Sequence, residues 1–184
     1  SISAILAFVG VSIGVMVLIL SMAIMNGTAK EFERKLFTMN YPLTIYPKMD
    51  NSLNEDLLVK LQNEYPKLKF SPFISSQAII QSGETMSGGM IFGVIPQKEA
   101  LINPVYKKAL GDLNLDKFDI ITGSGISDKL FLNPGTKTTL YFTELNPTGF
   151  SMMPKMKRFT YLTSFTSGLN AYDKSYMYTS MEAL

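Results

Sequence analysis

A run without a single charged side chain, Ser1 to Ala29, constrains this chain more than any other feature. Most of its residues are apolar, and it ends abruptly at the charged stretch Lys30 to Lys35. A helix needs about 20 predominantly apolar residues to cross roughly 30 Å of hydrocarbon. Helices of soluble domains are usually shorter and polar on one face. The sequence therefore predicts a transmembrane helix over residues 1–29, followed by a water-soluble domain over residues 30–184.

A cleaved signal peptide is the alternative interpretation of the first residues. Such a peptide has a basic start, an apolar core of about 7–15 residues and a small-residue cleavage site. No Lys or Arg precedes the apolar run here, and the run is longer than such a core. We therefore expect a membrane anchor. Because the sequence starts within the run and without Met, we also expect it to be a piece of a longer protein.

Small residues recur along the predicted anchor at helical spacing. Gly10 and Gly14 form a G-x-x-x-G, and Ser3 and Ala7 continue the pattern. Small residues on one face allow another transmembrane helix to approach closely. Gly is also frequent in membrane helices in general. Two interpretations therefore remain open: a face for packing against another helix, and the general tolerance of membrane helices for Gly and Ser. The pair Asn26-Gly27 predicts a helix break or cap at the far end.

Composition and motifs argue against an enzyme. The chain has no His and no Cys, which removes the commonest general base, the commonest metal ligand and any disulfide framework. The net charge of +2 is too small to indicate nucleic acid as a partner. The sequence around Gly135 resembles a phosphate-binding loop, but Leu130 stands where the first glycine is required. We expect no catalytic residue, no cofactor and no metal site.

The residues after the anchor predict an α+β domain with a mixed or antiparallel sheet. Aromatic and β-branched residues between turn signals favour a strand over Tyr41–Tyr46, and the leucine spacing favours a helix over Leu53–Tyr65. Ser87-Gly88-Gly89 is typical of a turn. Further strands are expected over 70–73, 77–81, 90–95, 118–122, 137–143, 158–165 and 175–179, with short helices over 97–110 and 124–131.

A long loop between two predicted strands is the strongest candidate for a binding surface. It runs from Asn146 to Lys157 and exceeds the two to five residues usual in hairpins, which is typical of functional or disordered loops. Exposed Met and Phe form an adaptable hydrophobic surface; burial of the same side chains in the domain's own core is the alternative. The apolar tip is Pro147, Phe150, Met152, Met153, Pro154 and Met156, with Lys155, Lys157 and Arg158 at its base.

Four segments of the sequence, taken together and in their order along the chain, resemble the pattern of a known family. The first is Gly14 to Leu18, followed by Ser21 and Met25-Asn26-Gly27, and the second is Gly93 to Pro96, followed by Glu99. The third is Ile120 to Leu130, which precedes Pro134-Gly135. The fourth contains Pro147, Gly149 and Pro154 and precedes Arg158 to Thr160. This succession resembles the lipoprotein-releasing ABC permeases of the LolC/LolE type, and the resemblance covers nearly the whole chain.

The resemblance implies a fold, a location and partners. It implies the first of four transmembrane helices of a multi-pass inner-membrane subunit, with the domain after residue 29 in the periplasm. It implies a MacB-like periplasmic core domain with a projecting β-hairpin, incomplete at its C-terminal end in these 184 residues. The implied partners are an ABC ATPase subunit, a second permease subunit (identical or different), acylated lipoproteins, the membrane and a periplasmic lipoprotein carrier. ATP hydrolysis then belongs to the separate ATPase subunit.

The resemblance also assigns residues. It implies a carrier-binding hairpin made of Pro147, Phe150, Met152, Met153, Pro154 and Lys157, although the tip is richer in Met than is usual in the family. Residues expected in a lipid path or in helix packing are Gly10, Gly14, Met16, Leu20, Ser21 and Met25. Two alternatives remain open: a MacB- or FtsX-like permease that exports small amphiphiles or signals across the membrane, and a membrane-anchored binding module.

Overall fold

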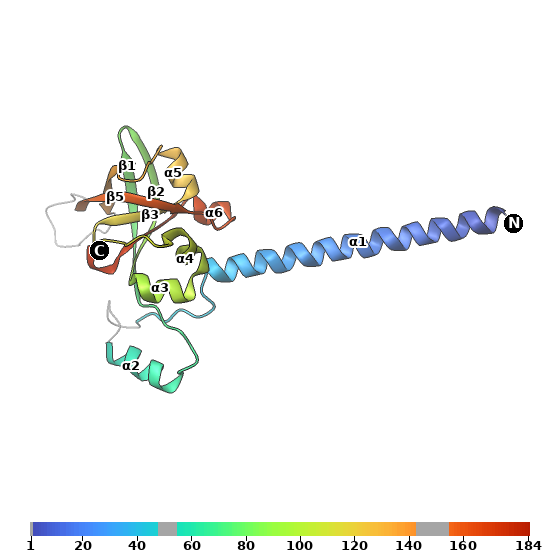
Figure 1. The fold of residues 1–184 in the computed structure, drawn as a ribbon, viewed down its shortest axis with the longest axis horizontal. Helices are drawn as coiled ribbons and strands as arrows, with labels where there is room; N and C mark the ends of the chain where they lie inside the picture. The colour runs from blue at the N-terminus through green and yellow to red at the C-terminus, as the bar shows by residue number, and fades with distance from the viewer. Residues whose placement is uncertain (1, 48–54, 143–154) are drawn as a thin grey trace. The chain divides into compact units, whose positions relative to one another are not determined.

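The computed structural model describes residues 2–47, 55–142 and 155–184. Contacts between residues divide the chain into two compact units, Ser1–Asn40 and Tyr41–Leu184. The first unit is a helix and the second contains all the strands (Figure 1). The two units are therefore described one after the other.

The first unit consists of the helix α1 (Ile2–Met39), which has 38 residues. At about 1.5 Å per residue its length is roughly 57 Å, more than a hydrocarbon core requires. Among the described residues, α1 is the helix long and apolar enough to cross a membrane. The expected break at Asn26-Gly27 is wrong, because the helix continues through both residues.

The continuation of α1 has a local cause. A glycine in a helix interior costs only about 1 kcal/mol relative to alanine. The turns that follow are supported by their own side chains: the Thr28 hydroxyl donates to the Ile24 carbonyl oxygen at 2.6 Å, and Arg34 forms an ion pair with Glu31 at 2.8 Å. Good helix formers in the charged stretch therefore extend the helix past the apolar run.

The second unit is built on a closed barrel of mixed strands. Its order is β1-β2-β6-β3-β5-β4, closed by pairing of β4 with β1. The β2–β6 and β3–β5 pairs are parallel and the other pairs are antiparallel. The strands are β1 (Phe73–Ser82), β2 (Thr85–Val94), β3 (Asp119–Gly123), β4 (Lys137–Phe142), β5 (Lys155–Phe165) and β6 (Tyr176–Ser180). The predicted α+β class with a mixed sheet is thus confirmed.

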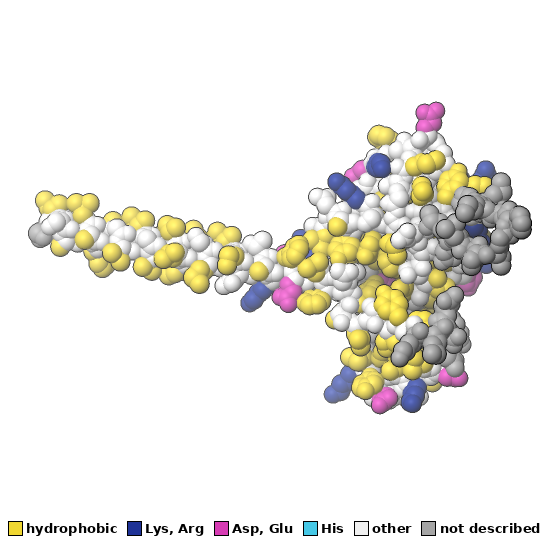
Figure 2. Space-filling model, turned by 180° about the vertical axis from the view of Figure 1, so that it is seen from behind, with side chains coloured by type: hydrophobic (Ala, Val, Ile, Leu, Met, Phe, Trp, Pro, Cys, Tyr) yellow, Lys and Arg dark blue, Asp and Glu magenta, His cyan; other side chains and the backbone are white. Residues whose placement is uncertain are grey.

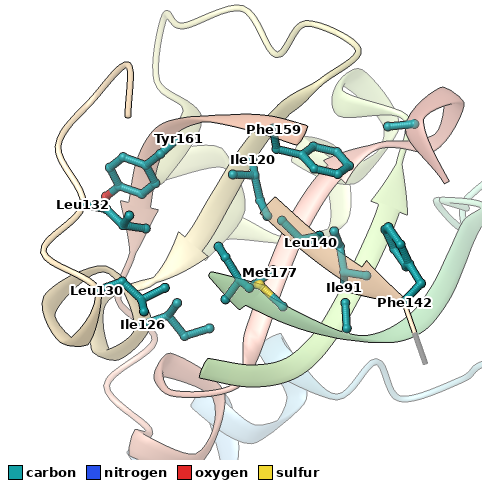
Figure 3. Packing of buried hydrophobic residues seen from close by; sticks show 13 residues of the cluster. Ile91, Ile120, Ile126, Leu130, Leu132, Leu140, Phe142, Phe159, Tyr161 and Met177 are labelled. Carbon is teal, nitrogen blue, oxygen red and sulfur yellow. The ribbon is translucent and has the colours of Figure 1, made fainter. Parts of the chain in front are cut away.

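The barrel interior is filled by apolar side chains, as expected for a barrel this small. Figure 3 shows Ile91, Ile120, Leu140 and Met177, from four different strands, pointing toward one another, and each is fully buried. The alternating burial along β4 places every second side chain inside, which is the period of a strand with one wet face. Burying one such side chain contributes about 1.5–3 kcal/mol, so the cluster as a whole stabilises the unit strongly.

Short helices precede, connect and follow the strands. They are α2 (Glu55–Glu64), α3 (Pro96–Ile102), α4 (Pro104–Leu110), α5 (Ser124–Lys129), α6 (Asn170–Asp173) and the 3₁₀ turn η1 (Met181–Ala183). Asn103 separates α3 from α4 and caps α4, because its side chain accepts a hydrogen bond from the Tyr106 backbone N–H at 2.9 Å. None of residues 56–64 of α2 is buried, in contrast to α3, α4 and α5, each of which has a buried side chain.

Two expected elements differ from the structure. Residues 41–47 form no strand, because Pro42 and Pro47 lack a backbone donor and the Tyr41 side chain bonds elsewhere in the domain. Ser87-Gly88-Gly89 is not a turn but lies within β2, which begins directly after the two-residue turn at Gly83-Glu84. The two short strands expected over 70–73 and 77–81 are replaced by the single strand β1.

Candidate functional site

The hairpin predicted to bind a partner begins from two paired strands. Strands β4 and β5 are antiparallel neighbours, and their pairing extends to Phe142 opposite Lys155. Residues 143–154 connect them. Most of the predicted binding residues fall outside the described residues, and their role stays a prediction: Pro147, Phe150, Met152, Met153 and Pro154.

Lys157 is the predicted hairpin residue that the structure does describe. Its ammonium group donates to the carbonyl oxygens of Ala183 and, at 3.2 Å, of Leu184. It also lies 5.7 Å from the centre of the Phe142 ring. Burial, together with the positive charges of Lys155 and Lys117, lowers the pKa of Lys157 from its ordinary value. Lys157 therefore fastens the base of the hairpin to the 3₁₀ turn η1 and the residue that follows it.

The exposed side chains at the hairpin base are basic and apolar. Lys155, Met156 and Arg158 are all exposed at the start of β5, and 62% of the Met156 surface is accessible. Because side chains alternate along a strand, Met156 and Arg158 lie on one face and Lys155 and Lys157 on the other. The base of the hairpin thus presents the Met156 thioether and the Arg158 guanidinium on one face and two lysines on the other.

The predicted residues of the anchor all lie on α1 with exposed side chains in its own unit. With 3.6 residues per turn, Gly10, Gly14, Ser21 and Met25 share one side of the helix. A Cβ added at either glycine meets no atom within 4 Å. Two other predicted residues, Met16 and Leu20, lie roughly 130° around the helix from that side. Apolar side chains recur along the part of α1 before its charged residues on the face drawn in Figure 2.

A buried polar cluster in the second unit was missed by sequence analysis. The Glu99 side chain is 1% exposed and accepts hydrogen bonds from the Tyr41 hydroxyl, from the Ser71 hydroxyl at 2.9 Å and from the Asn103 amide at 3.1 Å. The Asn103 amide also donates to the Tyr178 hydroxyl at 3.3 Å. A carboxylate removed from water is costly unless it is paired or hydrogen-bonded, so these donors stabilise its position.

Two tyrosine rings enclose this cluster. Tyr106 and Tyr178 are buried, and their ring centres lie 5.2 Å apart in an edge-to-face arrangement. Burial, and next the charge of Glu99, raises the pKa of Tyr106 and of Tyr178 above the usual value. Burial also raises the pKa of Tyr41. The Tyr106 hydroxyl makes no hydrogen bond to any described residue. The sequence contains little signal for the cluster, because Glu99 lies in α3 next to two other polar residues, Gln97 and Lys98.

Within the described ranges there is no group of three or more acidic, His or Cys side chains that could hold a metal ion. The cluster around Glu99 contains hydroxyls, one carboxylate and one amide. Its geometry is therefore that of a hydrogen-bonded joint rather than of a set of metal ligands.

Comparison with known proteins relates the chain to one domain family. The model of the MacB-like periplasmic core domain matches residues 4–177, which includes most of α1 and nearly all of the second unit. The match covers far more than half of the chain.

Individual relatives carry a more specific name. The lipoprotein-releasing system transmembrane protein LolC of Xylella fastidiosa is 26% identical over 181 residues, covering 96% of this chain and 44% of the relative. LolC of Neisseria meningitidis is 28% identical over 179 residues, covering 94% and 43%. LolE of Haemophilus influenzae is 25% identical over 150 residues, covering 75% and 35%. The chain therefore spans less than half the length of these relatives.

Proposed function

This chain belongs to the family of MacB-like periplasmic core domains, and on that premise we propose that the protein is the membrane subunit of an ABC transporter that releases lipoproteins. In this proposal it withdraws acylated lipoproteins from the inner membrane and passes them to a periplasmic carrier. It works with a second permease subunit and with a separate ATPase subunit that supplies the energy. The anchor lies in the inner membrane and the barrel domain in the periplasm.

One observation carries the proposal: the similarity to lipoprotein-releasing proteins is continuous from the membrane helix into the domain. The LolC of Neisseria meningitidis matches 94% of the chain without being restricted to the apolar helix. Apolar helices resemble one another by composition alone, whereas a match that continues through the barrel strands reflects a shared fold. The resemblance to the LolC/LolE type found in the sequence is confirmed by these relatives.

The energy needed to extract acyl chains from a membrane supports a separate ATPase subunit as the energy source. Each buried methylene group contributes about 0.8 kcal/mol to membrane binding, so several acyl chains resist extraction strongly. Binding to a permease alone does not supply that work. A partner that hydrolyses ATP is therefore part of the proposal.

Different sides of α1 suit different roles in this transporter. Gly10, Gly14 and Ser21 lie on one side and leave room for a neighbouring helix to pack closely. Met16 and Leu20 lie on another side and present flexible apolar chains. We assign helix packing to the first side, together with Met25, and contact with acyl chains to the second.

The hairpin between β4 and β5 is the proposed docking site for the carrier. Its two strands are paired up to Phe142 and Lys155, which gives the connecting residues 143–154 a firm base. Exposed Met156 and the basic residues Lys155 and Arg158 stand next to that connection. We propose that Phe150 and Met153 contact the carrier and that Lys157 stabilises the base.

A second candidate function follows from the family description itself. MacB-like periplasmic core domains are what the match identifies, so a permease that exports small amphiphiles or signals across the membrane remains the alternative. The two candidates differ in whether the hairpin contacts a lipoprotein carrier.

Photocrosslinking from the hairpin distinguishes the two functions. A photoreactive amino acid replaces Phe150 or Met153 in the full-length protein, in cells that contain the carrier. The proposal predicts an adduct with the carrier that is lost when Pro154 and Lys157 are both replaced by alanine. The same photoreactive residue at Phe131, an exposed position on another loop, is the control and gives no carrier adduct.

Absence of a carrier adduct from both hairpin positions, in a protein that reaches the membrane and assembles with its ATPase, would favour the second candidate.

A further inference from the structure

One edge of the barrel strand β2 is only partly covered. Strand β2 pairs with β1 along its whole length, from Thr85 to Val94. On its other side β6 pairs with Met90 to Val94, and the turn end of the β1–β2 hairpin continues past that pairing (Figure 1). No described residue pairs with this outer edge between Thr85 and Gly88. An uncovered strand edge offers unpaired backbone donors and acceptors to another chain.

Met86 and Gly88 direct their backbone groups to this open edge. In an antiparallel pair, successive residues direct their N–H and C=O groups alternately toward the partner strand and away from it. The Met90 N–H points away from β1, because it donates to the Ser175 carbonyl oxygen at 2.7 Å. The pairing of β1 with β2 has no register shift, so Gly88 and Met86, two and four residues earlier, also point away from β1.

The edge is accessible and lacks the usual protection. Gly88 is exposed, and because glycine has no side chain, this is exposure of its backbone. A Cβ added to Gly88 meets no atom within 4 Å, and the Met86 side chain beside it is 49% exposed. Natural sheets commonly block an edge with Lys, Pro or a bulge. The sequence Thr-Met-Ser-Gly-Gly over residues 85–89 contains neither residue, and the strand has no bulge there.

The geometry of the edge is complementary to a second copy of itself. Two β2 edges placed antiparallel about a two-fold axis at Ser87 bring Met86 opposite the partner's Gly88. Both residues direct their backbone groups to the edge, so this pair exchanges both of its hydrogen bonds and the symmetry repeats the pair. The long Met86 side chain then lies beside a residue that has no side chain.

The charges next to the edge favour the same arrangement. In this register Glu84 lies level with the partner's Met90, whose N–H is bonded to Ser175, the residue that follows Lys174. Glu84 and Lys174 are both exposed, and neither forms an ion pair with a described residue. The pairing therefore brings opposite charges together at each end, whereas the Glu84 side chains of the two copies lie at opposite ends.

We propose that the outer edge of β2 at Met86–Gly88 docks on the same edge of a second copy of this chain. An edge this short buries far less than the roughly 1,200–2,000 Å² of a stable interface. The contact therefore forms between copies that are already held in one assembly, where their effective concentration is high. The presence of a second permease subunit rests on the proposed function, whereas the open and self-complementary edge does not.

Cysteine crosslinking in the full-length protein tests the register. One tagged copy carries Met86→Cys and a differently tagged copy carries Gly88→Cys; both are expressed with the ATPase, and any other cysteine is replaced. The opposed Cα atoms of such a pair lie about 5.5 Å apart, which a disulfide can bridge. Met86→Cys in both copies is the register control, because those Cα atoms are offset by two residues and lie roughly 8 Å apart.

We expect an oxidant to link the Met86→Cys and Gly88→Cys copies at least about fivefold more efficiently than the register control. Glu84→Lys and Lys174→Glu, each alone, place like charges together and are expected to lower the yield about fivefold. The two changes combined restore it. Lys108→Glu, an exposed position on α4, is the matched charge control and leaves the yield unchanged.

Equal yields in the register pair and its control, or adducts with another protein in place of a second copy, would overturn this docking. A combined charge swap that does not restore the yield would overturn the contact between Glu84 and Lys174. Lipoprotein release by a complex without the register-specific crosslink would remove the edge pairing and leave the proposed function standing. The crosslink in an assembled complex that hydrolyses ATP but releases no lipoprotein would contradict the proposed function and leave the pairing standing.

Discussion

Gly89 lies so close to Ser175 that a Cβ added to Gly89 would be 2.2 Å from the Ser175 carbonyl oxygen. The same oxygen accepts a hydrogen bond from the Met90 backbone N–H at 2.7 Å. The glycine therefore allows the residue before β6 to join the edge of β2, where the parallel β2–β6 pairing begins at Met90 and Tyr176. This contact closes one seam of the barrel.

Replacing Gly89 by alanine is predicted to destabilise the domain by about 3 kcal/mol, since backbone must move to remove the overlap. Gly88→Ala is the matched control, because a Cβ there meets no atom within 4 Å. We expect the control to change stability by less than about 1 kcal/mol. Urea unfolding of the detergent-solubilised protein measures both. Equal stabilities of the two variants would contradict the described seam.

The buried hydroxyl of Tyr106 gives a second prediction. It makes no hydrogen bond to a described residue, so Tyr106→Phe removes a buried polar group without breaking a described bond. We expect neutral or slightly higher stability, by up to about 1 kcal/mol, at pH 7. Tyr178→Phe, which loses the bond from Asn103, is expected to cost about 1 kcal/mol. Thermal unfolding of the two variants and the wild type measures these stabilities. A Tyr106→Phe variant that is less stable than Tyr178→Phe would refute the prediction.

The same residue predicts a pH dependence. Burial and the charge of Glu99 raise the pKa of Tyr106 in the folded domain above the usual value of about 10. The unfolded chain therefore loses the phenol proton first as pH rises. The associated stability is fully present below pH 10 and is lost at about 1.4 kcal/mol per pH unit above it. Unfolding free energies from pH 8 to 11 are expected to fall less steeply in Tyr106→Phe than in the wild type; parallel curves would contradict this.

Local patterns predicted much of the barrel. The strand expected over 137–143 is found as Lys137–Phe142, and the one expected over 175–179 as Tyr176–Ser180. Both are rich in aromatic and β-branched residues, and the first follows the turn signal Asn133-Pro134-Gly135, so the information lies within or next to the segment. The anchor was also evident, because a long run without charge is a property of composition.

Long-range contacts explain what the sequence did not reveal. The pair Gly88-Gly89 is typical of a turn, and the approach of Ser175 accounts for a glycine within the strand at Gly89 but not at Gly88. Tyr41 is an aromatic residue of the kind that favours strands. Its hydrogen bond to Glu99, 58 positions away, explains why its side chain bonds within the domain instead. The sequence placed Lys157 at the hairpin base, but its bonds to Ala183 and Leu184 join residues 26 and 27 positions apart and were not predicted.

Reconstituted lipoprotein release tests the central claim most directly. The full-length permease, its ATPase and its second subunit are placed in proteoliposomes with an acylated lipoprotein, and the purified carrier is added outside. The account predicts ATP-dependent transfer of the lipoprotein to the soluble carrier, which is absent when the ATPase is inactivated or when residues 143–154 are replaced by a short turn. ATP hydrolysis without any transfer, in a complex that is fully assembled, would contradict the account.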